Sequence, residues 1–361
     1  MRENERTPKF QDNKVRRAEQ GAFYHITDNS GKFLSITLGY KDASPEKCLE
    51  AVIAPYEGSN LYSFKAGGRD FIWYDPELPL ADFLTGTPVL FPFPNRIEDA
   101  VWTWKGKAHL QKKDGIPVQL HSLVYDEKSW KYSGPDFRDD AVFLTTYIEM
   151  DENHPIFRGF PFKCTLSLTF ALTSEKLTVS YRIENSDSTE IPFGFALHPY
   201  FAKLSGEDGT LLCVPCRYWY ELRDDADKAF LNKFNGGYAM VPNLLPTGRL
   251  MDADTCGLSL KNPAAVGTLD LDHVYTGFIE GRSSYIDYAS LGMRLKIIGT
   301  SDFTHNVVYT PKGRPFFCIE PQTCSTDAIN LHAKGIEHAH LMVLPPKCVH
   351  TGSVDFIPER C

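Results

Sequence analysis

The sequence predicts an all-β protein, a large antiparallel β-sandwich, and three observations support this. Apolar and polar residues alternate with a period of two, most clearly over residues 164–170 and 177–183. The chain has 24 prolines and 26 glycines, which favours many turns between short strands. Convincing amphipathic helices are absent, so the alternating strands and helices of a Rossmann or α/β-barrel fold are not expected.

The elements follow in order along the chain. Residues 1–20 are rich in charge and poor in apolar side chains, which predicts a disordered or loosely attached arm. Residues 21–361 contain no linker and are expected to form a single domain. The two alternating segments form a hairpin with its turn at residues 173–176. Further short strands are predicted at residues 33–38, 49–54, 101–104, 108–111, 141–148, 293–298 and 316–319.

Charge and hydropathy exclude several classes of partner. A formal net charge of −8 disfavours binding to nucleic acid or to an anionic membrane through bulk electrostatics. No apolar run reaches the roughly 18 residues of a membrane span. The N-terminus is polar where a signal peptide would need an apolar stretch, and we therefore expect a cytoplasmic protein.

The sequence contains no clear binding motif for a cofactor. Neither GxGxxG nor GxxxxGK[ST] occurs, so a nucleotide is not expected. The nine cysteines are scattered and odd in number, which predicts free thiols. Cys213 and Cys216 have CxxC spacing, but residues 211–214 are predicted as a strand, so metal or redox use stays a minor alternative. His338 and His340 lack a third ligand nearby. We expect no cofactor and no metal.

The run Leu-Phe-Pro-Phe-Pro-Asn-Arg-Ile at residues 90–97 is the most informative segment. Its prolines fix the backbone and remove donors, so the run is predicted to be extended and rigid. It delivers Asn95 and Arg96 side by side, as a ligand-presenting loop does. For an isolated Arg96, a structural salt bridge would be the better interpretation.

Four further polar residues stand where apolar strands end, which is where a sheet commonly presents functional groups. Glu320 closes a predicted buried strand, so it must be paired, protonated or functional, and pairing with an arginine is the structural alternative. His198 lies between a strand and a proline turn and, alone, would be a satisfied core histidine. For Asp272 the simpler interpretation is that it caps a turn, and for His121 that it is an exposed loop histidine.

Together these contexts resemble the aldose 1-epimerase (galactose mutarotase) family from about residue 31 to residue 356. The Phe-Pro-Asn-Arg-Ile run is similar to the family's Asn-Arg loop, which implies substrate-binding roles for Asn95 and Arg96. Asp272 matches the family's sugar-binding Asp. His121 resembles its first active-site His, although Ser122 follows where the family usually has glycine.

Two motifs imply the catalytic pair. His-Pro-Tyr-Phe at residues 198–201 is similar to the motif whose His acts as the general acid, which puts that role on His198. Cys-Ile-Glu-Pro-Gln at residues 318–322, followed by Asp327 and Asn330, matches the motif that carries the catalytic Glu, here Glu320. The family's galactose mutarotase-like β-supersandwich agrees with the fold predicted from the strand pattern.

The resemblance implies an isomerase of carbohydrate metabolism that interconverts the α and β anomers of a free aldohexose such as galactose or glucose. Glu320 would take the proton of the C1 hydroxyl and His198 would protonate the ring oxygen, a reaction that needs only proton transfer. The four substrate-binding residues would hold the sugar between the acid and the base.

Three alternatives remain open at this stage. A hexose-6-phosphate 1-epimerase would need a cluster of cations, and the acidic Glu98 and Asp99 next to Arg96 do not provide one. A non-catalytic carbohydrate-binding or sugar-sensing domain would not need residues that match the family's catalytic Glu and His, which are here Glu320 and His198. A glycosidase would use Asp272 and Glu320 as paired carboxylates.

Overall fold

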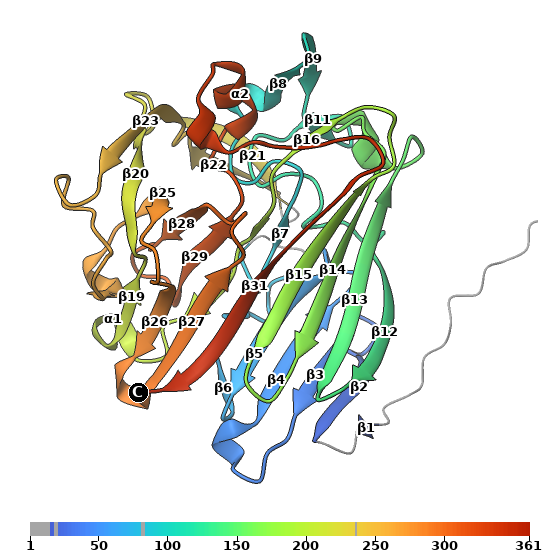
Figure 1. The fold of residues 1–361 in the computed structure, drawn as a ribbon, viewed down its shortest axis with the longest axis vertical. Helices are drawn as coiled ribbons and strands as arrows, with labels where there is room; N and C mark the ends of the chain where they lie inside the picture. The colour runs from blue at the N-terminus through green and yellow to red at the C-terminus, as the bar shows by residue number, and fades with distance from the viewer. Residues whose placement is uncertain (1–14, 18–20, 81–83, 235–236) are drawn as a thin grey trace, which may run out of the picture.

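The computed structural model describes residues 15–17, 21–80, 84–234 and 237–361. Three antiparallel sheets dominate it (Figure 1). The N-terminal sheet contains, in spatial order, β1 (Arg16–Arg17), β2 (Ala22–Asp28), β3 (Leu34–Tyr40), β4 (Leu49–Ala54), β5 (Asn60–Ala66) and β6 (Arg69–Asp70). Most of the arm predicted for residues 1–20 lies outside the described residues, but β1 pairs with β2.

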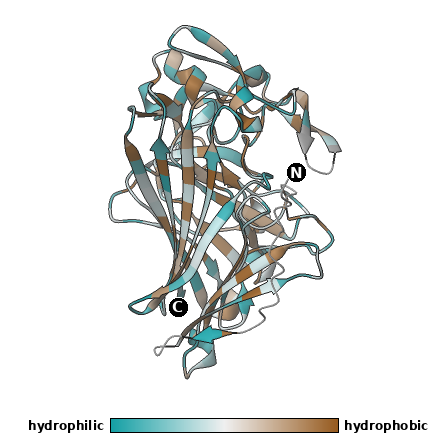
Figure 2. Cartoon of the chain, turned by 90° about the vertical axis from the view of Figure 1, so that its right-hand side faces the viewer, coloured by the Kyte–Doolittle hydropathy of each residue, from teal (hydrophilic) through white to brown (hydrophobic). Residues whose placement is uncertain are grey.

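A nine-stranded sheet forms the largest layer. In spatial order its strands are β12 (Lys131–Arg138), β13 (Ala141–Met150), β14 (Cys164–Leu172), β15 (Leu177–Asn185), β31 (Val349–Arg360), β27 (Met293–Gly299), β26 (Ser284–Tyr288), β19 (Thr210–Cys213) and β24 (Ala264–Ala265). Buried and less buried residues alternate along β14 and β15, so the predicted hairpin is confirmed. Figure 2 shows the same alternation as hydrophobic and hydrophilic segments on the long strands.

The third sheet is the one that positions the site. Its strands, in spatial order, are β23 (Pro246–Asp252), β20 (Cys216–Leu222), β25 (Asp272–Phe278), β28 (His305–Tyr309), β29 (Phe316–Gln322), β17 (Ala196–Leu197) and β7 (Val89–Leu90), and β18 (Tyr200–Ala202) also pairs with β29. Because β29 continues to Gln322, Glu320 lies inside a strand, and the prediction that it closes one was wrong.

Short elements complete the chain. Four two-stranded ribbons are formed by β8 (Val101–Trp104) with β9 (Lys107–Leu110), β10 (Lys112–Lys113) with β11 (Ile116–Pro117), β16 (Ile191–Phe193) with β30 (Met342–Leu344), and β21 (Ala229–Phe234) with β22 (Gly237–Pro242). The described helices are α1 (Gly206–Gly209), α2 (Ala328–Ala333) and the 3₁₀ turns η1 (Pro45–Lys47), η2 (Glu98–Ala100), η3 (Pro155–Arg158), η4 (Val266–Thr268), η5 (Ala289–Leu291) and η6 (Glu337–Ala339). The all-β prediction is therefore confirmed.

The core lies between the sheets, where β13 and β14 pack on β2 to β4. An aromatic cluster within the core anchors the proline-rich run that precedes Asn95. The ring of Phe93 lies 5.2 Å from that of Trp102 and 5.9 Å from that of Phe160, both in edge-on contact. Phe91 and Phe93 are buried, so the apolar residues of this run are packing residues that fix the start of the loop.

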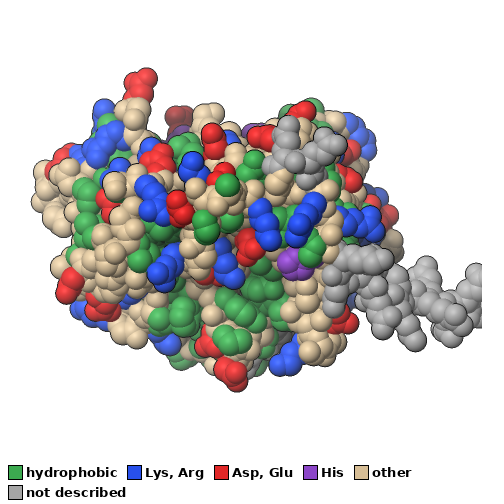
Figure 3. All heavy atoms as spheres, turned by 90° about the horizontal axis from the view of Figure 1, so that it is seen from below, with side chains coloured by type: hydrophobic (Ala, Val, Ile, Leu, Met, Phe, Trp, Pro, Cys, Tyr) green, Lys and Arg blue, Asp and Glu red, His purple; other side chains and the backbone are tan. Residues whose placement is uncertain are grey.

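The surface carries both signs of charge. Figure 3 shows lysine and arginine side chains interspersed with aspartate and glutamate on the face seen from below. A single-sign field of the kind that gathers polyanions is not seen on that face. Among the described residues, no helix is both long enough and apolar enough to span a bilayer.

Candidate active site

The register of β29 places His198 opposite Glu320. β29 is paired with β17 at Ala196 and Gln322, and with β18 at Tyr200 and Cys318. His198 and Pro199 interrupt this ladder between the two short strands, and counting along both chains puts His198 across from Glu320. Proline cannot donate to a ladder, so the break follows directly from the His-Pro sequence. The imidazole therefore occupies the gap beside the carboxyl group.

The carboxyl and the imidazole form a buried pair. Nε2 of His198 lies 3.0 Å from Oε1 of Glu320, and the two side chains are only 4% and 2% exposed. The second oxygen, Oε2, accepts a hydrogen bond of 3.2 Å from Nε2 of Gln322. The partner of Glu320 is thus a histidine, and the structural alternative in which it pairs with an arginine was wrong.

Burial favours the neutral form of both partners. It raises the pKa of Glu320 well above its ordinary value, and the nearby Asp272 carboxylate raises this pKa further. Burial also lowers the pKa of His198 to about 3, with a further contribution from the positive charge of Arg96. Both shifts favour a pair that holds one proton, with the proton on the carboxyl and Nε2 of His198 as its acceptor. The two groups titrate as a coupled pair.

The Asn95–Arg96 loop is held by hydrogen bonds from two distant segments. The amide of His121 donates to the carbonyl of Asn95 at 2.7 Å, and the amide of Asp327 donates to the carbonyl of Arg96 at 2.9 Å. Oδ1 of Asp327 accepts from the amide of Glu98 at 3.2 Å. The loop is therefore fixed on both sides, as a binding loop must be.

Arg96 is locked in one orientation. Its Nη1 donates to Oδ1 of Asn95 at 2.8 Å, its Nη2 to Oδ2 of Asp272 at 3.3 Å, and its Nε to the carbonyl of Pro242 at 3.1 Å. The salt bridge anticipated for an isolated arginine does form, but its partner is another predicted sugar-binding residue. Asp272 opens β25 and its side chain is 30% exposed, which leaves part of the carboxylate open to a ligand.

His121 is buried, so the alternative of an exposed loop position was wrong. Its ring lies edge-on to that of His198, with the centroids 5.2 Å apart. Burial, the neighbouring His198 and the charge of Arg96 lower the pKa of His121 well below its ordinary value. The imidazole is therefore neutral, with one nitrogen able to donate and the other able to accept a hydrogen bond.

Ser122 explains how the loop tolerates the absence of the expected glycine. Its φ is +71°, in the left-handed region that favours glycine, and that of His121 is +62°. The Ser122 hydroxyl accepts from the amide of Phe93 at 2.9 Å and donates to its carbonyl at 2.7 Å. These two bonds offset the strain and tie this loop to the proline-rich run.

All six predicted residues line one cavity of about 540 Å³, namely Asn95, Arg96, His121, His198, Asp272 and Glu320. The sequence analysis missed Tyr309, Arg314 and the residues of β22 that also line it. Tyr309 pairs with Asp272 across the ladder of β25 and β28, but β28 is almost wholly buried and shows no alternation that could have revealed this. Arg314 and β22 likewise had no sequence signal, since neither lies in a motif.

One set of side chains offers metal-ligand atoms. In the described part of the chain, the potential ligand atoms of His198, Cys318 and Glu320 lie within 4.8 Å of one another. Such a nitrogen, sulfur and oxygen set suits zinc. However, burial raises the pKa of the Cys318 thiol well above its ordinary value, and Nε2 of His198 already contacts Glu320. The expectation of no metal stays a prediction, and all nine cysteines are free.

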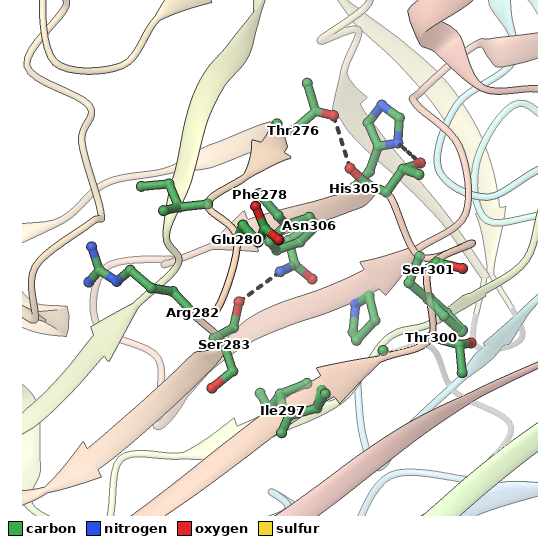
Figure 4. Close-up of a pocket in the computed structure, with 18 of the residues that line it drawn as sticks. Thr276, Phe278, Glu280, Arg282, Ser283, Ile297, Thr300, Ser301, His305 and Asn306 are labelled. Atoms are coloured by element: carbon green, nitrogen blue, oxygen red, sulfur yellow. Dashed lines mark hydrogen bonds between the residues drawn. The ribbon is translucent and has the colours of Figure 1, made fainter.

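A second cavity, of about 640 Å³, is lined by residues from β25 to β29 and from the segments between them (Figure 4). His305, Asn306 and Pro321 are among its lining residues. Nδ2 of Asn306 donates to the Ser284 hydroxyl at 3.0 Å. Its one carboxylate, Glu280, is exposed and forms no ion pair with a histidine among the described residues. Among the described residues that line it, this cavity therefore lacks a carboxylate–histidine pair like that of the first, although His305 and His340 line it with their rings 5.5 Å apart.

Comparisons with known protein families and sequences give a family match and a partial sequence match. The profile of the family described as aldose 1-epimerase matches residues 45–356. An uncharacterised Escherichia coli K12 protein, YphB, is 28% identical over 112 residues, a match that spans 31% of this chain and 35% of YphB.

Two solved structures have the same fold. A galactose mutarotase-like protein from Clostridium acetobutylicum superimposes with a TM-score of 0.79 at 18% identity, covering 95% of this chain and 100% of its own. The galactose 1-epimerase of Lactobacillus acidophilus NCFM gives a TM-score of 0.69 at 14% identity, covering 93% and 98%. At these identities the likeness supports the mutarotase-like sandwich fold alone.

Asp327 should make the stability of the fold depend on pH. Burial raises its pKa from the ordinary 3.8 to about 7, so between these values the folded state holds a proton that the unfolded chain has lost. The free energy of unfolding should therefore fall as the pH rises through this window. Asp327→Asn removes this titration but keeps the acceptor for the Glu98 amide. Urea unfolding at pH 5 and pH 8 should show a smaller fall for the variant, and equal falls would contradict the assignment.

Proposed function

Because the chain belongs to the aldose 1-epimerase family, we propose that it interconverts the α and β anomers of a free aldohexose such as galactose or glucose. The observation that carries this proposal is the buried pair of Glu320 and His198, 3.0 Å apart at one cavity. Opening a pyranose ring requires one group to take the proton of the C1 hydroxyl and another to protonate the ring oxygen. A carboxyl and an imidazole that share one proton can do both.

The proton returns to its starting place in each cycle. Ring opening begins from the ionic pair, in which Glu320 removes the C1 hydroxyl proton and the His198 imidazolium protonates the ring oxygen as the C1–O5 bond breaks. The pair is then neutral, the form that burial favours. Rotation about C1–C2 presents the other face of the aldehyde, and closure reverses both transfers. The reaction is redox-neutral and releases no group.

Four residues would hold the sugar for this chemistry. The locked guanidinium of Arg96 and the amide of Asn95 present donors in fixed directions, and Asp272 offers the exposed part of its carboxylate as an acceptor. Neutral His121 can serve as donor or acceptor. Holding the substrate in a near-reactive orientation can supply a large share of the rate.

The competing functions are less well supported. A glycosidase would use Asp272 and Glu320 as a working pair of carboxylates, but Asp272 is bound to Arg96 and Glu320 to His198. A non-catalytic sugar-binding domain would gain nothing from burying an acid/base pair, since such burial is costly. One observation favours a sugar phosphate: exposed Arg314 borders the cavity and forms no ion pair within the described part of the chain.

Polarimetry on freshly dissolved α-sugars, corrected for spontaneous mutarotation, tests these alternatives. We expect glucose and galactose to be converted after dialysis against a chelator, and glucose 6-phosphate to be a poorer substrate. The reason is that Arg96 is already neutralised by Asp272, so among the described residues that line the cavity only Arg314 offers an exposed cation to a phosphate. A higher kcat/KM for glucose 6-phosphate would assign the chain to sugar phosphates, and activity that only zinc restores would make the histidine, cysteine and glutamate set a metal site.

Glu320→Gln should abolish proton transfer without unfolding the protein. Glutamine can still hydrogen-bond to His198 but cannot accept the C1 proton, and general acid–base catalysis typically contributes ~10²–10⁴-fold. We expect kcat to fall by about that factor, with a melting temperature near that of the wild type. His198→Asn should behave similarly. Glu184→Gln, the same change at a partly exposed site on β15, is the matched control and should keep full activity. An active Glu320→Gln variant would refute the base role.

Activity should persist into acid. A second proton on the neutral pair would remove the only base, but the pKa of His198 is lowered from 6.5 to about 3. The acid limb of kcat/KM, which reports the free enzyme, should therefore lie well below pH 6.5. Initial rates measured between pH 7 and pH 4 check this. A decline with its midpoint near 6.5 would mean that His198 titrates as an ordinary exposed histidine.

A further inference from the structure

Cys318 belongs to a row of paired residues that runs across four strands of the third sheet. It pairs with Tyr200 on β18 and with Tyr309 on β28. Tyr309 in turn pairs with Asp272 on β25. Residues directly opposite each other in a ladder have side chains on the same face of the sheet. The other three members of the row line the site cavity, so the Cys318 thiol is on the cavity side of β29.

The thiol lies behind the cavity wall, close to the buried pair. Cys318 is 0% exposed and is not itself a lining residue. Glu320 lies two residues further along β29, which places its side chain on the same face, and His198 contacts it from the gap in the ladder. Among the described residues, the potential ligand atoms of these three side chains all lie within 4.8 Å of one another.

The spacing of the pair suits a bound ion. Bonds of about 2.0–2.2 Å from a tetrahedral zinc ion to nitrogen and oxygen place these two ligand atoms about 3.3 Å apart. Nε2 of His198 and Oε1 of Glu320 are 3.0 Å apart, so a small outward shift accommodates an ion bound to both.

We propose that Cys318, Glu320 and His198 form a zinc site at which Zn²⁺ binds reversibly and blocks the acid/base pair. A nitrogen, sulfur and oxygen set suits zinc and leaves a fourth position for water from the cavity. Glu320 and His198 line that cavity, so an ion that arrives from solvent meets them first. The thiolate favours Zn²⁺ over Mg²⁺, which prefers oxygen ligands.

Binding exchanges protons for the ion. The Cys318 thiol loses its proton, and the proton shared by Glu320 and His198 also leaves, so two protons are released for each Zn²⁺ bound and nothing is oxidised or reduced. Burial opposes the loss of the thiol proton, because it raises the pKa of Cys318 well above its ordinary value. We therefore expect an ion that a chelator removes rather than a permanent cofactor.

The effect on turnover follows from the proposed function, on which this part of the inference rests. A carboxylate oxygen and an imidazole nitrogen that bind zinc cannot also move protons to and from a sugar. The C1 hydroxyl must contact the same carboxylate, so zinc and the sugar compete for it. Zinc should therefore raise the apparent KM, and excess sugar should relieve the inhibition.

The kinetic experiment measures initial rates of galactose mutarotation by polarimetry with added Zn²⁺ or Mg²⁺. In the wild type, Zn²⁺ should inhibit at concentrations at which Mg²⁺ has no effect, and a chelator should restore the full rate. Cys318→Ala removes one ligand and leaves the acid/base pair in place. The zinc concentration for half inhibition should rise at least about tenfold, because losing even a residue that only supports a metal ligand typically costs about 10–100-fold in affinity.

Two further variants control for packing. Cys318→Ser nearly keeps the size of the side chain but replaces the soft sulfur, so it should weaken zinc inhibition as Cys318→Ala does. Cys324 is also a free, buried cysteine, but it does not belong to the set. Cys324→Ala should therefore keep the zinc sensitivity of the wild type.

Binding of Co²⁺ tests the metal site independently of turnover. A bond between Co²⁺ and a thiolate gives a charge-transfer absorption in the near ultraviolet. The wild type should show this band and lose it when zinc is added. The band should be absent in Cys318→Ala and present in Cys324→Ala.

Three results would overturn the proposal. The first is equal inhibition by Zn²⁺ and Mg²⁺, and the second is unchanged zinc inhibition in both Cys318 variants. The third is the absence of any Co²⁺ band that depends on Cys318. A protein that shows this band but converts no sugar would support the metal site and refute the proposed function alone.

Discussion

A carboxyl group buried as deeply as that of Glu320 needs a partner, and much of the site follows from how the fold supplies one. Glu320 lies inside a central strand, 2% exposed, where an uncompensated charge would be strongly unfavourable. The partner comes from a gap in the same sheet, because Pro199 interrupts the ladder between β17 and β18 and leaves His198 across from the carboxyl. The gap at Pro199 thus supplies the histidine that offsets the cost of burying Glu320 and that can share its proton.

The second constraint is backbone strain around this pair. Asn95, His121, Ser122 and Asp327 all have positive φ angles without being glycine. Such residues persist only where the surroundings over-determine them. Here the determinants are the hydrogen bonds that join the Asn95–Arg96 loop to the segments of His121 and Asp327, and the Ser122 hydroxyl on Phe93. These hydrogen bonds hold the side chains that line the cavity in one arrangement despite the strain.

The strands could be predicted because their signal is local. Alternation alone located β14 and β15, and the bounds of β4 and β8 agree with the predicted ranges. The end of β29 was misplaced because Pro321, normally unfavourable in a central strand, lies inside it.

The site could be predicted only as far as its motifs extend. The six residues that the motifs supplied do line one cavity. Which side chains pair with one another could not be predicted from the sequence. Arg96 and Asp272, for example, form an ion pair although they lie 176 positions apart. Arg314 and Tyr238 were missed for the same reason: an exposed side chain in a loop or short hairpin has no periodicity, and its place beside the cavity depends on the whole fold.

The cavity separates two physical requirements along its depth. Its interior must exclude water, because the shifted pKa values of Glu320 and His198 arise chiefly from burial. Part of its lining comes instead from a two-stranded hairpin, β21 and β22, outside the large sheets. The hydrogen bond from Arg96 to the Pro242 carbonyl links the interior of the cavity directly to this hairpin. Because this link uses a backbone oxygen, side-chain substitutions on the hairpin leave its acceptor in place, and the orientation of Arg96 does not depend on which side chains the hairpin carries.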